Sequence, residues 1–377
     1  MSHQLLCCGD ATDLSTWSNI PYFLLQAGKS RGVLSAGLAL RPERLRWLRR
    51  LWNLQQWLRT GRLGGFQYSN CFLRSLWRQA RLLPASEDQF CRLLSHYPLL
   101  PPFPWPQNWE VSFYIDATTR QVFDDYGAGT RIAPGLKRAV LRQEQMAYAA
   151  AKAVITMSSW AAESVCRDYG IDPSRIYVVP GGANLDEQAL AELPAASLPP
   201  PPSAQAPLRL GFLGKDWHRK GGPFVLALAE GLQFIGIPAV VRAIGPPIAD
   251  LPSHPLLQPL GFINKRTQME AFTRELRSWH FGTLFSSSEA YGISNRECLR
   301  LGVPVLARAI GGIPSTFNGA NCGKLFGEHA GVEDVVAWIQ AQVNSYDRYL
   351  TMRQQLADHA WDFSWDATAL QLQEILG

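Results

Sequence analysis

Short apolar runs alternate with helix-like segments along the first half of the chain. The runs that are predicted to be strands lie at residues 4–8, 33–40, 110–115, 153–157 and 175–179. Helices are predicted for residues 19–31 and from Ser158 to Gly170, because serine caps helix starts and glycine favours helix ends. This alternation predicts a parallel sheet that is covered by helices.

A proline-rich segment at residues 194–207, PAASLPPPPSAQAP, interrupts this alternation. Four consecutive prolines cannot lie inside a helix or a sheet, so a linker is predicted here. The alternation then restarts, with apolar runs at residues 208–214, 238–245, 281–288 and 303–308. The chain is therefore predicted to be an α/β protein with two Rossmann-like lobes, and the cleft between such lobes is the default ligand site.

The domain limits follow from the linker and from the last residues. Residues 1–199 are predicted to form the first lobe and residues 200–360 the second. The final stretch, FSWDATALQLQEILG, predicts a separate amphipathic helix within residues 361–377. A length of 377 residues exceeds one average domain, which agrees with two lobes.

Composition narrows the class of protein. Apolar residues make up 47% and charged residues 18%, which indicates folded cores rather than a disordered chain. The seven cysteines include no CxxC pair and indicate free thiols in a reducing compartment. The N-terminus lacks the features of a signal peptide, and no run reaches 18 apolar residues. A cytoplasmic protein is therefore expected.

Positive charge is concentrated in residues 41–81, where ten arginines stand against one acid, Glu43, a net charge of +9. Leucines and tryptophans recur among these arginines at helical spacing. One interpretation is a helix that packs its apolar face on the sheet and leaves a solvated basic face. A second is peripheral contact with the inner face of a membrane, since tryptophan and arginine suit the membrane–water interface. A third is an anionic soluble acceptor; no nucleic-acid partner is expected.

The stretch EAYGISNREC, residues 289–298, joins a predicted strand to a helix that starts near Gly292. The first N–H groups of a helix have no partner inside it, so with the helix dipole they form an anion site. Glu289 and Glu297 flank this start, and carboxylates accept hydrogen bonds from sugar hydroxyls. The alternative is a capping box of Ser294 and Glu297, which would make Glu297 purely structural.

A second strand-to-helix turn reads GFLGKDWHRKGG, residues 211–222. Its strand ends at Gly214, and Lys215, Arg219 and Lys220 follow closely. These cations are suited to neutralise a diphosphate leaving group, whereas the alternative is a solvated basic loop. Because two anion-suited turns lie at the same edge of one sheet, the binding-site interpretation is favoured over a solvated loop.

Asp116 directly follows the predicted strand EVSFYI. A carboxylate at the carboxyl end of a strand is placed to face the ligand, and capping of the next helix is the competing role. The histidines and paired carboxylates show no spacing that suits a metal, so neither a metal nor a cofactor is expected.

Together these stretches resemble retaining glycosyltransferases of the GT-B fold, in the family 4 group. The resemblance rests on GFLGKDWHRKGG, LGFINK, SEAYGISNREC, GVPVLARAIGGIP and MSSWAAESVCRDYGIDPSRIYVVPGGANLD, which cover most of residues 150–320 in the expected order. It implies two Rossmann-like lobes that face a cleft, and a C-terminal helix that packs back on the first lobe.

The resemblance also implies roles for single residues. Glu289 would bind hydroxyls of the donor sugar, Glu297 the ribose, and Ile263 the base through its backbone. The backbone amides from Gly292 to Ser294 would hold the diphosphate, which Lys220 would neutralise. The predicted nucleotide-sugar-binding residues are Gly214, Lys215, Arg219, Lys220, Ile263, Glu289, Gly292, Ile293, Ser294 and Glu297, and the predicted catalytic residues are Glu289, Lys220 and Asp116.

The chain departs from the family pattern in three respects. Lys215 replaces the usual arginine, which removes a bidentate phosphate contact. Ser18 and Asn19 occupy a first loop that is usually rich in glycine, and Asp116 stands where many members have a histidine. The last two departures concern the half of the chain that would bind the acceptor.

The implied reaction is transfer of a hexose from a nucleotide-diphosphate sugar to an acceptor hydroxyl, with anomeric retention and without a metal. In this family the leaving diphosphate deprotonates the acceptor on the same face, so the protein supplies position and charge. Lipid-linked and anionic acceptors are candidates. Two alternatives stay open: a GT-B-like nucleotide-sugar epimerase, and a non-catalytic module that binds nucleotide sugars.

Overall fold

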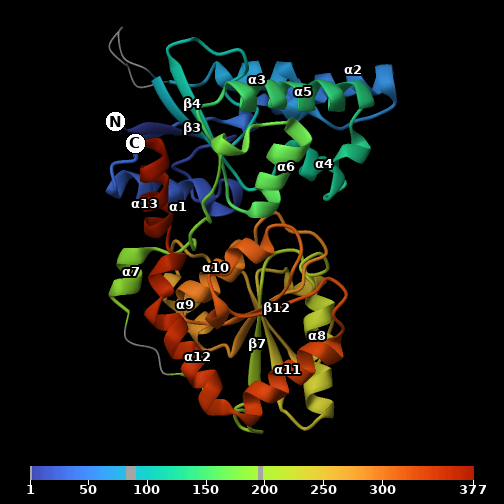
Figure 1. Cartoon of the computed structure of the whole chain (residues 1–377). Coiled ribbons are helices and arrows are strands. Elements are labelled where there is room, and N and C mark those ends of the chain that lie inside the picture. Colours follow the sequence, from blue (N-terminus) through green and yellow to red (C-terminus); the bar gives the residue numbers. More distant parts are fainter. Residues whose placement is uncertain (1, 82–90, 194–197) are drawn as a thin grey trace. The chain divides into compact units, whose positions relative to one another are not determined.

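The structure is a computed structural model, and it describes residues 2–81, 91–193 and 198–377. The chain forms two compact units: unit 1 comprises Met1–Pro180 and Ala369–Gly377, and unit 2 comprises Gly181–Thr368. Each unit contains one six-stranded sheet with helices around it (Figure 1). The domain limits predicted at residues 199 and 360 stay a prediction; the compact units change at residues 180 and 368.

The sheet of unit 1 is parallel, in the order β2-β1-β3-β4-β5-β6. Its strands are β1 His3–Leu6, β2 Leu34–Gly37, β3 Cys91–Ser95, β4 Trp109–Ile115, β5 Val154–Thr156 and β6 Ile176–Val178. Only β3 lies outside the predicted strands, because Arg92 interrupts its apolar run. Arg92 pairs with Glu110 directly opposite on β4, at 3.1 Å, and such cross-strand pairs stabilise a sheet.

In the described part of unit 1, six α-helices precede β6. They are α1 Ile20–Ser30, α2 Arg46–Thr60, α3 Asn70–Trp77, α4 Thr119–Asp124, α5 Pro134–Ala150 and α6 Ser159–Tyr169. The limits of α6 confirm the prediction: the Ser158 hydroxyl accepts a hydrogen bond from the N–H of Ala161, and Gly170 is the C-cap. Capping residues therefore marked this helix correctly in the sequence.

The sheet of unit 2 is also parallel, in the order β12-β11-β10-β7-β8-β9. Its strands are β7 Leu208–Leu213, β8 Ala239–Ile244, β9 Leu257–Gly261, β10 Phe281–Leu284, β11 Val305–Arg308 and β12 Gly323–Phe326. The helices of this unit are α7 Glu187–Ala191, α8 Gly222–Phe234, α9 Met269–Arg277, α10 Ile293–Arg300, α11 Val332–Asn344 and α12 Tyr346–Asp358. This strand order is that of dinucleotide-binding Rossmann folds, with its switch point between β7 and β10.

Alternate residues of β7 show how the sheet of unit 2 is covered. Leu208, Leu210 and Phe212 are buried and pack with Val225 and Leu228 of α8 in one apolar cluster. They share a face because successive residues of a strand point to opposite sides. Burying one such side chain stabilises the fold by about 1.5–3 kcal/mol. The predicted α/β class with two Rossmann-like lobes is confirmed.

The chain passes between the two units twice, at residues 180–181 and 368–369. Within unit 2, the segments next to these two points are hydrogen-bonded to each other. The N–H of Ala183 donates to the backbone oxygen of Phe363 at 2.7 Å, and Trp365 Nε1 donates to Asn184 Oδ1 at 2.9 Å. The last helix, α13 Trp365–Leu376, begins here, and its residues from Ala369 onward group with unit 1. Among the helices described, none is both long and apolar enough to cross a bilayer.

Candidate functional site

The switch point of unit 2 brings two of the sequence motifs together. The neighbouring strands β7 and β10 run parallel, so their carboxyl ends lie at one edge of the sheet. The basic loop that starts at Gly214 follows β7, and the loop that carries Glu289 follows β10. Ligands of open α/β sheets bind at such a point.

Three charged side chains from these loops form one cluster. Lys220 Nζ donates to Glu289 Oε2 at 2.8 Å, and Arg219 Nη1 donates to the same oxygen at 3.3 Å. Arg219 also donates to the backbone oxygen of Ser288, at 2.7 Å. Gly214 leaves room for the lysine, because a Cβ there would lie 2.2 Å from Cδ of Lys220. The lysine stem therefore crosses Gly214 to reach Glu289.

Glu289 is held as a carboxylate. Its side chain is only 12% exposed, and burial by itself raises the pKa of a carboxyl group. The charges and hydrogen bonds of Lys220 and Arg219 outweigh this burial and hold the pKa of Glu289 below its usual value. An ionised carboxylate only accepts hydrogen bonds, which suits it to the hydroxyl groups of a sugar.

The start of α10 has the features that favour anion binding. Gly292, its N-cap, has φ 93° and ψ 55°, in the left-handed region that favours glycine. No side chain of the described residues caps this helix start, and the buried hydroxyl of Ser294 has no hydrogen-bond partner among them. Uncapped N–H groups at a helix start bind anions. The capping-box alternative for Ser294 and Glu297 is wrong, because the helix begins before Ser294 and Glu297 has a different partner.

That partner is Lys265, in the segment between β9 and α9. Glu297 is 2% exposed and forms an ion pair with the ammonium group of Lys265. Burial raises the pKa of Glu297, and the charge of Lys265 opposes this rise. Lys265 was not predicted as a site residue: it belongs to the quoted stretch LGFINK, but no sequence spacing links it to Glu297.

Three further predicted donor-site residues, Lys215, Ile263 and Ile293, also lie outside the ion pairs. Lys215 is exposed, with Nζ 6.0 Å from the ring centroid of Phe262. Ile263 is half-buried and packs against an apolar cluster of unit 2. Ile293 is the half-buried first residue of α10. The predicted contact between Ile263 and a base stays a prediction.

Asp116 lies in unit 1, at the carboxyl end of β4, and is half-buried. It does not cap the next helix, because the hydroxyl of Thr118 accepts the N–H of Gln121 in a capping box at the start of α4. The capping alternative for Asp116 is therefore wrong. In the described part of the chain, no group of three or more His, Cys, Asp or Glu side chains is placed to hold a metal.

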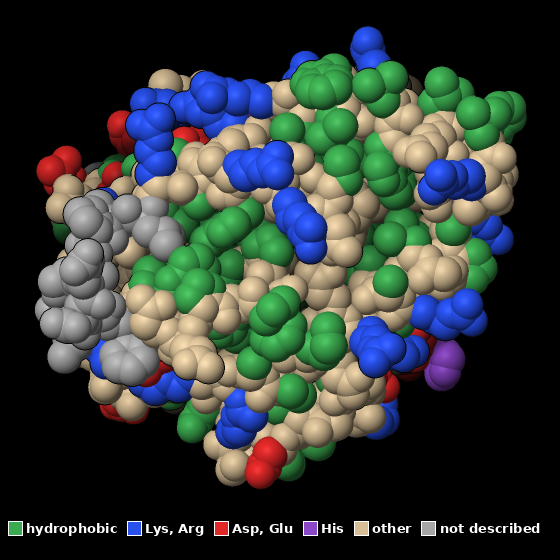
Figure 2. Space-filling model, turned by 90° about the horizontal axis from the view of Figure 1, so that it is seen from above, with side chains coloured by type: hydrophobic (Ala, Val, Ile, Leu, Met, Phe, Trp, Pro, Cys, Tyr) green, Lys and Arg blue, Asp and Glu red, His purple; other side chains and the backbone are tan. Residues whose placement is uncertain are grey.

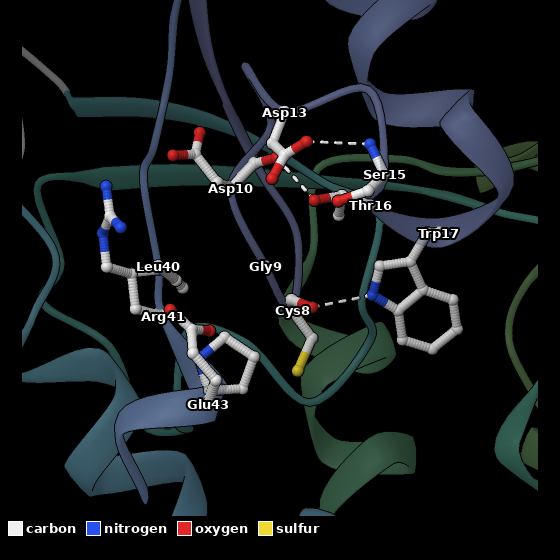
Figure 3. A pocket seen from close by; sticks show the side chains of 11 residues that line it. Cys8, Gly9, Asp10, Asp13, Ser15, Thr16, Trp17, Leu40, Arg41 and Glu43 are labelled. Carbon is white, nitrogen blue, oxygen red and sulfur yellow. Dashed lines mark hydrogen bonds between the residues drawn. The ribbon is translucent and has the colours of Figure 1, made fainter. Parts of the chain in front are cut away.

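A pocket of about 530 Å³ opens at the carboxyl ends of β1 and β2 in unit 1 (Figure 3). Its charged lining consists of Asp10, Asp13, Arg41 and Glu43, and Trp17 adds an aromatic ring. Asp10 Oδ1 accepts hydrogen bonds from the N–H and the hydroxyl of Thr12, at 2.9 and 2.6 Å. The loop after β1 thus orients its own carboxylates.

This loop has an unusual backbone. Trp17, Ser18 and Asn19 have φ angles of 42°, 56° and 70°. Such angles are uncommon outside glycine, and each costs roughly 1–3 kcal/mol. Side chains hold the conformation: Trp17 Nε1 donates to the backbone oxygen of Cys8 at 2.8 Å, and the amide of Asn19 donates to that of Leu14. Ser18 and Asn19, which depart from the glycine-rich pattern, thus keep a conformation that glycine favours.

The chain is an α/β protein of two Rossmann-like units, and the switch point of unit 2 holds the cluster of Lys220, Arg219 and Glu289 close to the uncapped start of α10. A sequence profile described as Glycosyltransferase Family 4 matches residues 121–187. The chain is also 27% identical, over 301 residues, to the D-inositol 3-phosphate glycosyltransferase of Gordonia bronchialis. That alignment covers 73% of this chain and 63% of the relative, so the chain spans less than two thirds of the relative's length.

Solved structures share the fold across the whole chain. Sucrose-phosphate synthase from Thermosynechococcus elongatus has a TM-score of 0.61 at 14% identity, covering 100% of this chain and 98% of its own. HepE of Anabaena, in complex with UDP-glucose, has a TM-score of 0.59 at 12% identity, covering 100% and 99%. The predicted resemblance to family 4 glycosyltransferases and the predicted GT-B fold are therefore confirmed.

Proposed function

We propose that this chain is a glycosyltransferase that moves a hexose from a nucleotide-diphosphate sugar to an acceptor hydroxyl, with retention of the anomeric configuration. The observation that carries the proposal is the cluster of Lys220, Arg219 and Glu289 at the switch point of unit 2. The uncapped start of α10 follows three residues after Glu289. Such a site suits a diphosphate at the helix start and sugar hydroxyls at the carboxylate.

The diphosphate gains negative charge as the sugar leaves it. The first N–H groups of α10 and the unpartnered hydroxyl of Ser294 would bind its oxygens, and Lys220 would neutralise the developing charge. In the free protein Lys220 is paired with Glu289, so a bound diphosphate shares this lysine. When a bound diphosphate weakens the hydrogen bond from Lys220 to Glu289, the hydrogen bond from Arg219 still balances the negative charge of Glu289.

Glu297 is assigned to the ribose of the nucleotide. A carboxylate accepts both ribose hydroxyls, and a buried one must have a charged or hydrogen-bonding partner when no ligand is present. Lys265 supplies that partner in the free protein. Nucleotide binding would then exchange part of an internal ion pair for hydrogen bonds from the ribose.

No side chain needs to act as a nucleophile. The leaving diphosphate takes the proton of the acceptor hydroxyl on the face from which it departs. The new glycosidic bond then forms on that same face, which retains the configuration. The cations at the switch point supply the charge stabilisation that a metal ion supplies elsewhere, so the reaction is proposed to proceed without metal or cofactor.

The pocket of unit 1 is the proposed acceptor site. Three carboxylates and one guanidinium line it, so an uncharged sugar or polyol matches its charge better than a phosphorylated one. Trp17, which is 47% exposed, offers a ring face for a sugar. Asp116, also in unit 1, is proposed to orient a substrate hydroxyl. The Gordonia relative is named for a phosphorylated inositol, and an unphosphorylated acceptor is proposed here instead.

Thermal unfolding with UDP, GDP and ADP tests the donor site. A ligand at 100 times its Kd stabilises a protein by about 2.7 kcal/mol, and UDP is expected to act best because HepE binds UDP-glucose. Release of nucleoside diphosphate from nucleotide hexoses, with inositol or inositol 3-phosphate as acceptor, tests the reaction. NMR of the product's anomeric proton tests retention.

Several results would contradict the proposal. Absence of stabilisation by all three nucleotides removes the donor site. Nucleotide binding without release across the acceptors leaves a binding module. An inverted product refutes the same-face mechanism, and activity that EDTA abolishes and Mn²⁺ restores refutes the metal-free reaction.

A further inference from the structure

Helix α2 of unit 1 carries apolar side chains on two different sides. On the inner side, Leu48 and Trp52 pack against the apolar cluster of unit 1 that also contains Phe66 and Phe72. Trp52 lies against Phe66, with ring centroids 5.8 Å apart. This contact fixes which side of the helix faces the protein.

The outward stripe consists of Trp47, Leu51, Leu54 and Leu58. Their exposed fractions are 62%, 59%, 55% and 72%. Spacings of four, three and four residues place them on one face, because an α-helix has 3.6 residues per turn. All of α2 is described, and it contains no buried residue. The packing interpretation therefore holds for Leu48 and Trp52, whereas the residues of the outward stripe stay exposed.

Arginines border the outward stripe. Helical geometry places Arg46 and Arg50 along one side of it, and α2 also carries Arg49 and Arg59 but no acidic residue. All four are exposed, and within the described chain none forms an ion pair. The arginines of α2 therefore carry positive charge that no ion pair compensates within the described chain, and two of them border the stripe.

The basic face extends beyond α2. All ten arginines of residues 41–81 are exposed, and α3 and α5 pack on the same apolar cluster as α2. On α5, Arg138 and Arg142 are exposed as well. Figure 2 looks onto this side of unit 1, where basic and hydrophobic side chains are interspersed and acidic ones lie near the margins.

We propose that this face of unit 1 docks on the surface of an anionic lipid bilayer. The outward stripe would enter the headgroup region, with Trp47 at the depth that tryptophan favours, and the arginines would bind lipid phosphates. Because the core of unit 1 holds the inner side of α2, the helix would lie flat on the bilayer. Large exposed apolar patches with a charged rim mark such interaction surfaces.

A second copy of this chain is the competing occupant, because the spacing of the outward stripe also suits a helix–helix seam. Two copies of α2 would bring the arginines of both helices together without any acid of α2 to compensate them. Like charges at an interface are repulsive, whereas an anionic bilayer supplies the opposite charge. The charges of α2 therefore favour lipid over a second copy.

Flotation of the full chain with lipid vesicles tests the proposal. The protein is expected to float with phosphatidylcholine vesicles that contain phosphatidylglycerol, and not with pure phosphatidylcholine. High salt should release it, since the Debye length falls from about 10 Å at 0.1 M to about 3 Å at 1 M.

A charge variant measures the basic contribution. Each arginine near an anionic leaflet strengthens binding about fivefold, so Arg46→Gln, Arg49→Gln and Arg50→Gln together should weaken partition about 100-fold at low salt. The matched control replaces Lys29, Lys324 and Arg348 by Gln; all three are exposed and lie outside this face. It changes the net charge equally and should leave partition unchanged.

A stripe variant measures the apolar contribution. Trp47→Gln, Leu51→Gln, Leu54→Gln and Leu58→Gln together should weaken partition at least about tenfold, because the side chains no longer enter the interface. Their exposure means that the fold should persist, which circular dichroism checks.

Three results would overturn the proposal: no binding to anionic vesicles at low salt, full binding by the stripe variant, or equal loss of binding in the matched control. Sedimentation equilibrium distinguishes the competing occupant. A dimer that the stripe variant abolishes would also overturn docking on lipid. None of these readouts depends on the transferase reaction.

Discussion

The carboxyl edges of the two sheets are built in different ways. In unit 2 the charged side chains are matched in pairs, Lys220 and Arg219 with Glu289, and Lys265 with Glu297. In unit 1 the pocket carboxylates Asp10 and Asp13 are oriented by hydrogen bonds from their own loop. One edge is organised by side-chain charge and the other by local backbone structure.

This difference suits the two kinds of ligand proposed for the two units. The proposed diphosphate needs cations, and buried cations are stable only when paired, so the charged cluster of unit 2 carries its own counter-charges. The proposed neutral polyol needs hydrogen-bond acceptors on a shaped loop, and unit 1 forms that loop at the cost of three left-handed residues, Trp17 to Asn19. Four experiments separate these two designs.

The largest effect is expected from Lys220→Ala in unit 2. Loss of a charge-assisted hydrogen bond costs about 1.5–3 kcal/mol, so the Kd for UDP should rise about tenfold to 150-fold. Binding of uridine, which has no phosphate, should change little, and isothermal titration calorimetry measures both. Lys324→Ala is the control, because Lys324 is exposed, lies on β12 of the same unit and is not a predicted site residue. Equal losses for UDP and uridine would show that the lysine does not act on the diphosphate.

Glu297→Gln should weaken nucleotide binding about tenfold, since an amide accepts ribose hydroxyls less strongly than a carboxylate. A capping role, in which glutamine serves as well, is already excluded by the start of α10 at Gly292. The matched control is Glu187→Gln, which breaks the ion pair of Glu187 with Arg300 in the same unit. Unchanged UDP affinity in Glu297→Gln would remove the ribose assignment.

Acid should weaken both units through one buried histidine each. Burial lowers the pKa of His3 in unit 1 and of His280 in unit 2 to about 4, from 6.5. Between these values the unfolded chain binds protons that the folded chain does not, so stability falls as pH falls from 6.5 toward 4. Each histidine contributes up to about 1.4 kcal/mol per pH unit.

Urea unfolding at pH 7 and pH 5 measures this loss. His280→Gln keeps one acceptor and one donor for the contacts with the N–H of Arg209 and the backbone oxygen of Pro200. It should flatten the pH dependence of unit 2 while that of unit 1 persists. The same pH dependence in the variant and the parent would contradict a neutral buried His280.

The smallest effect is expected from Ser18→Gly in unit 1. Glycine adopts φ 56° without strain, so the unfolding free energy should rise by about 1 kcal/mol, or about 2–4 °C in Tm. Ser35→Gly, in strand β2, should instead lower stability by about 0.5–1 kcal/mol. Calorimetry measures both, and a destabilised Ser18→Gly would show that the loop is not strained at this residue.

Much of the donor site could be predicted because it depends on local rules. Strand ends and helix starts are visible in the sequence, and parallel neighbours place their carboxyl ends together, so Lys220, Glu289 and Gly292 were expected at one edge. Lys265 was missed because its pairing with Glu297 depends on how β9 and α9 are placed beside α10. A capping role for Glu297 could be excluded only from the observed start of α10, because a short capping motif in the sequence is compatible with several helix starts.

Sequence periodicity by itself determined the α/β class and the helical spacing of leucines and tryptophans among the arginines of residues 41–81. It could not determine which apolar residues of α2 face inward, because Leu48 and Leu51 both fit a helical repeat and differ only in their angle around the axis. The tertiary structure decided this by packing Trp52 on Phe66, which leaves Leu51 and Leu58 exposed. Burial is a property of contacts between elements far apart in sequence, and those contacts have no local signature.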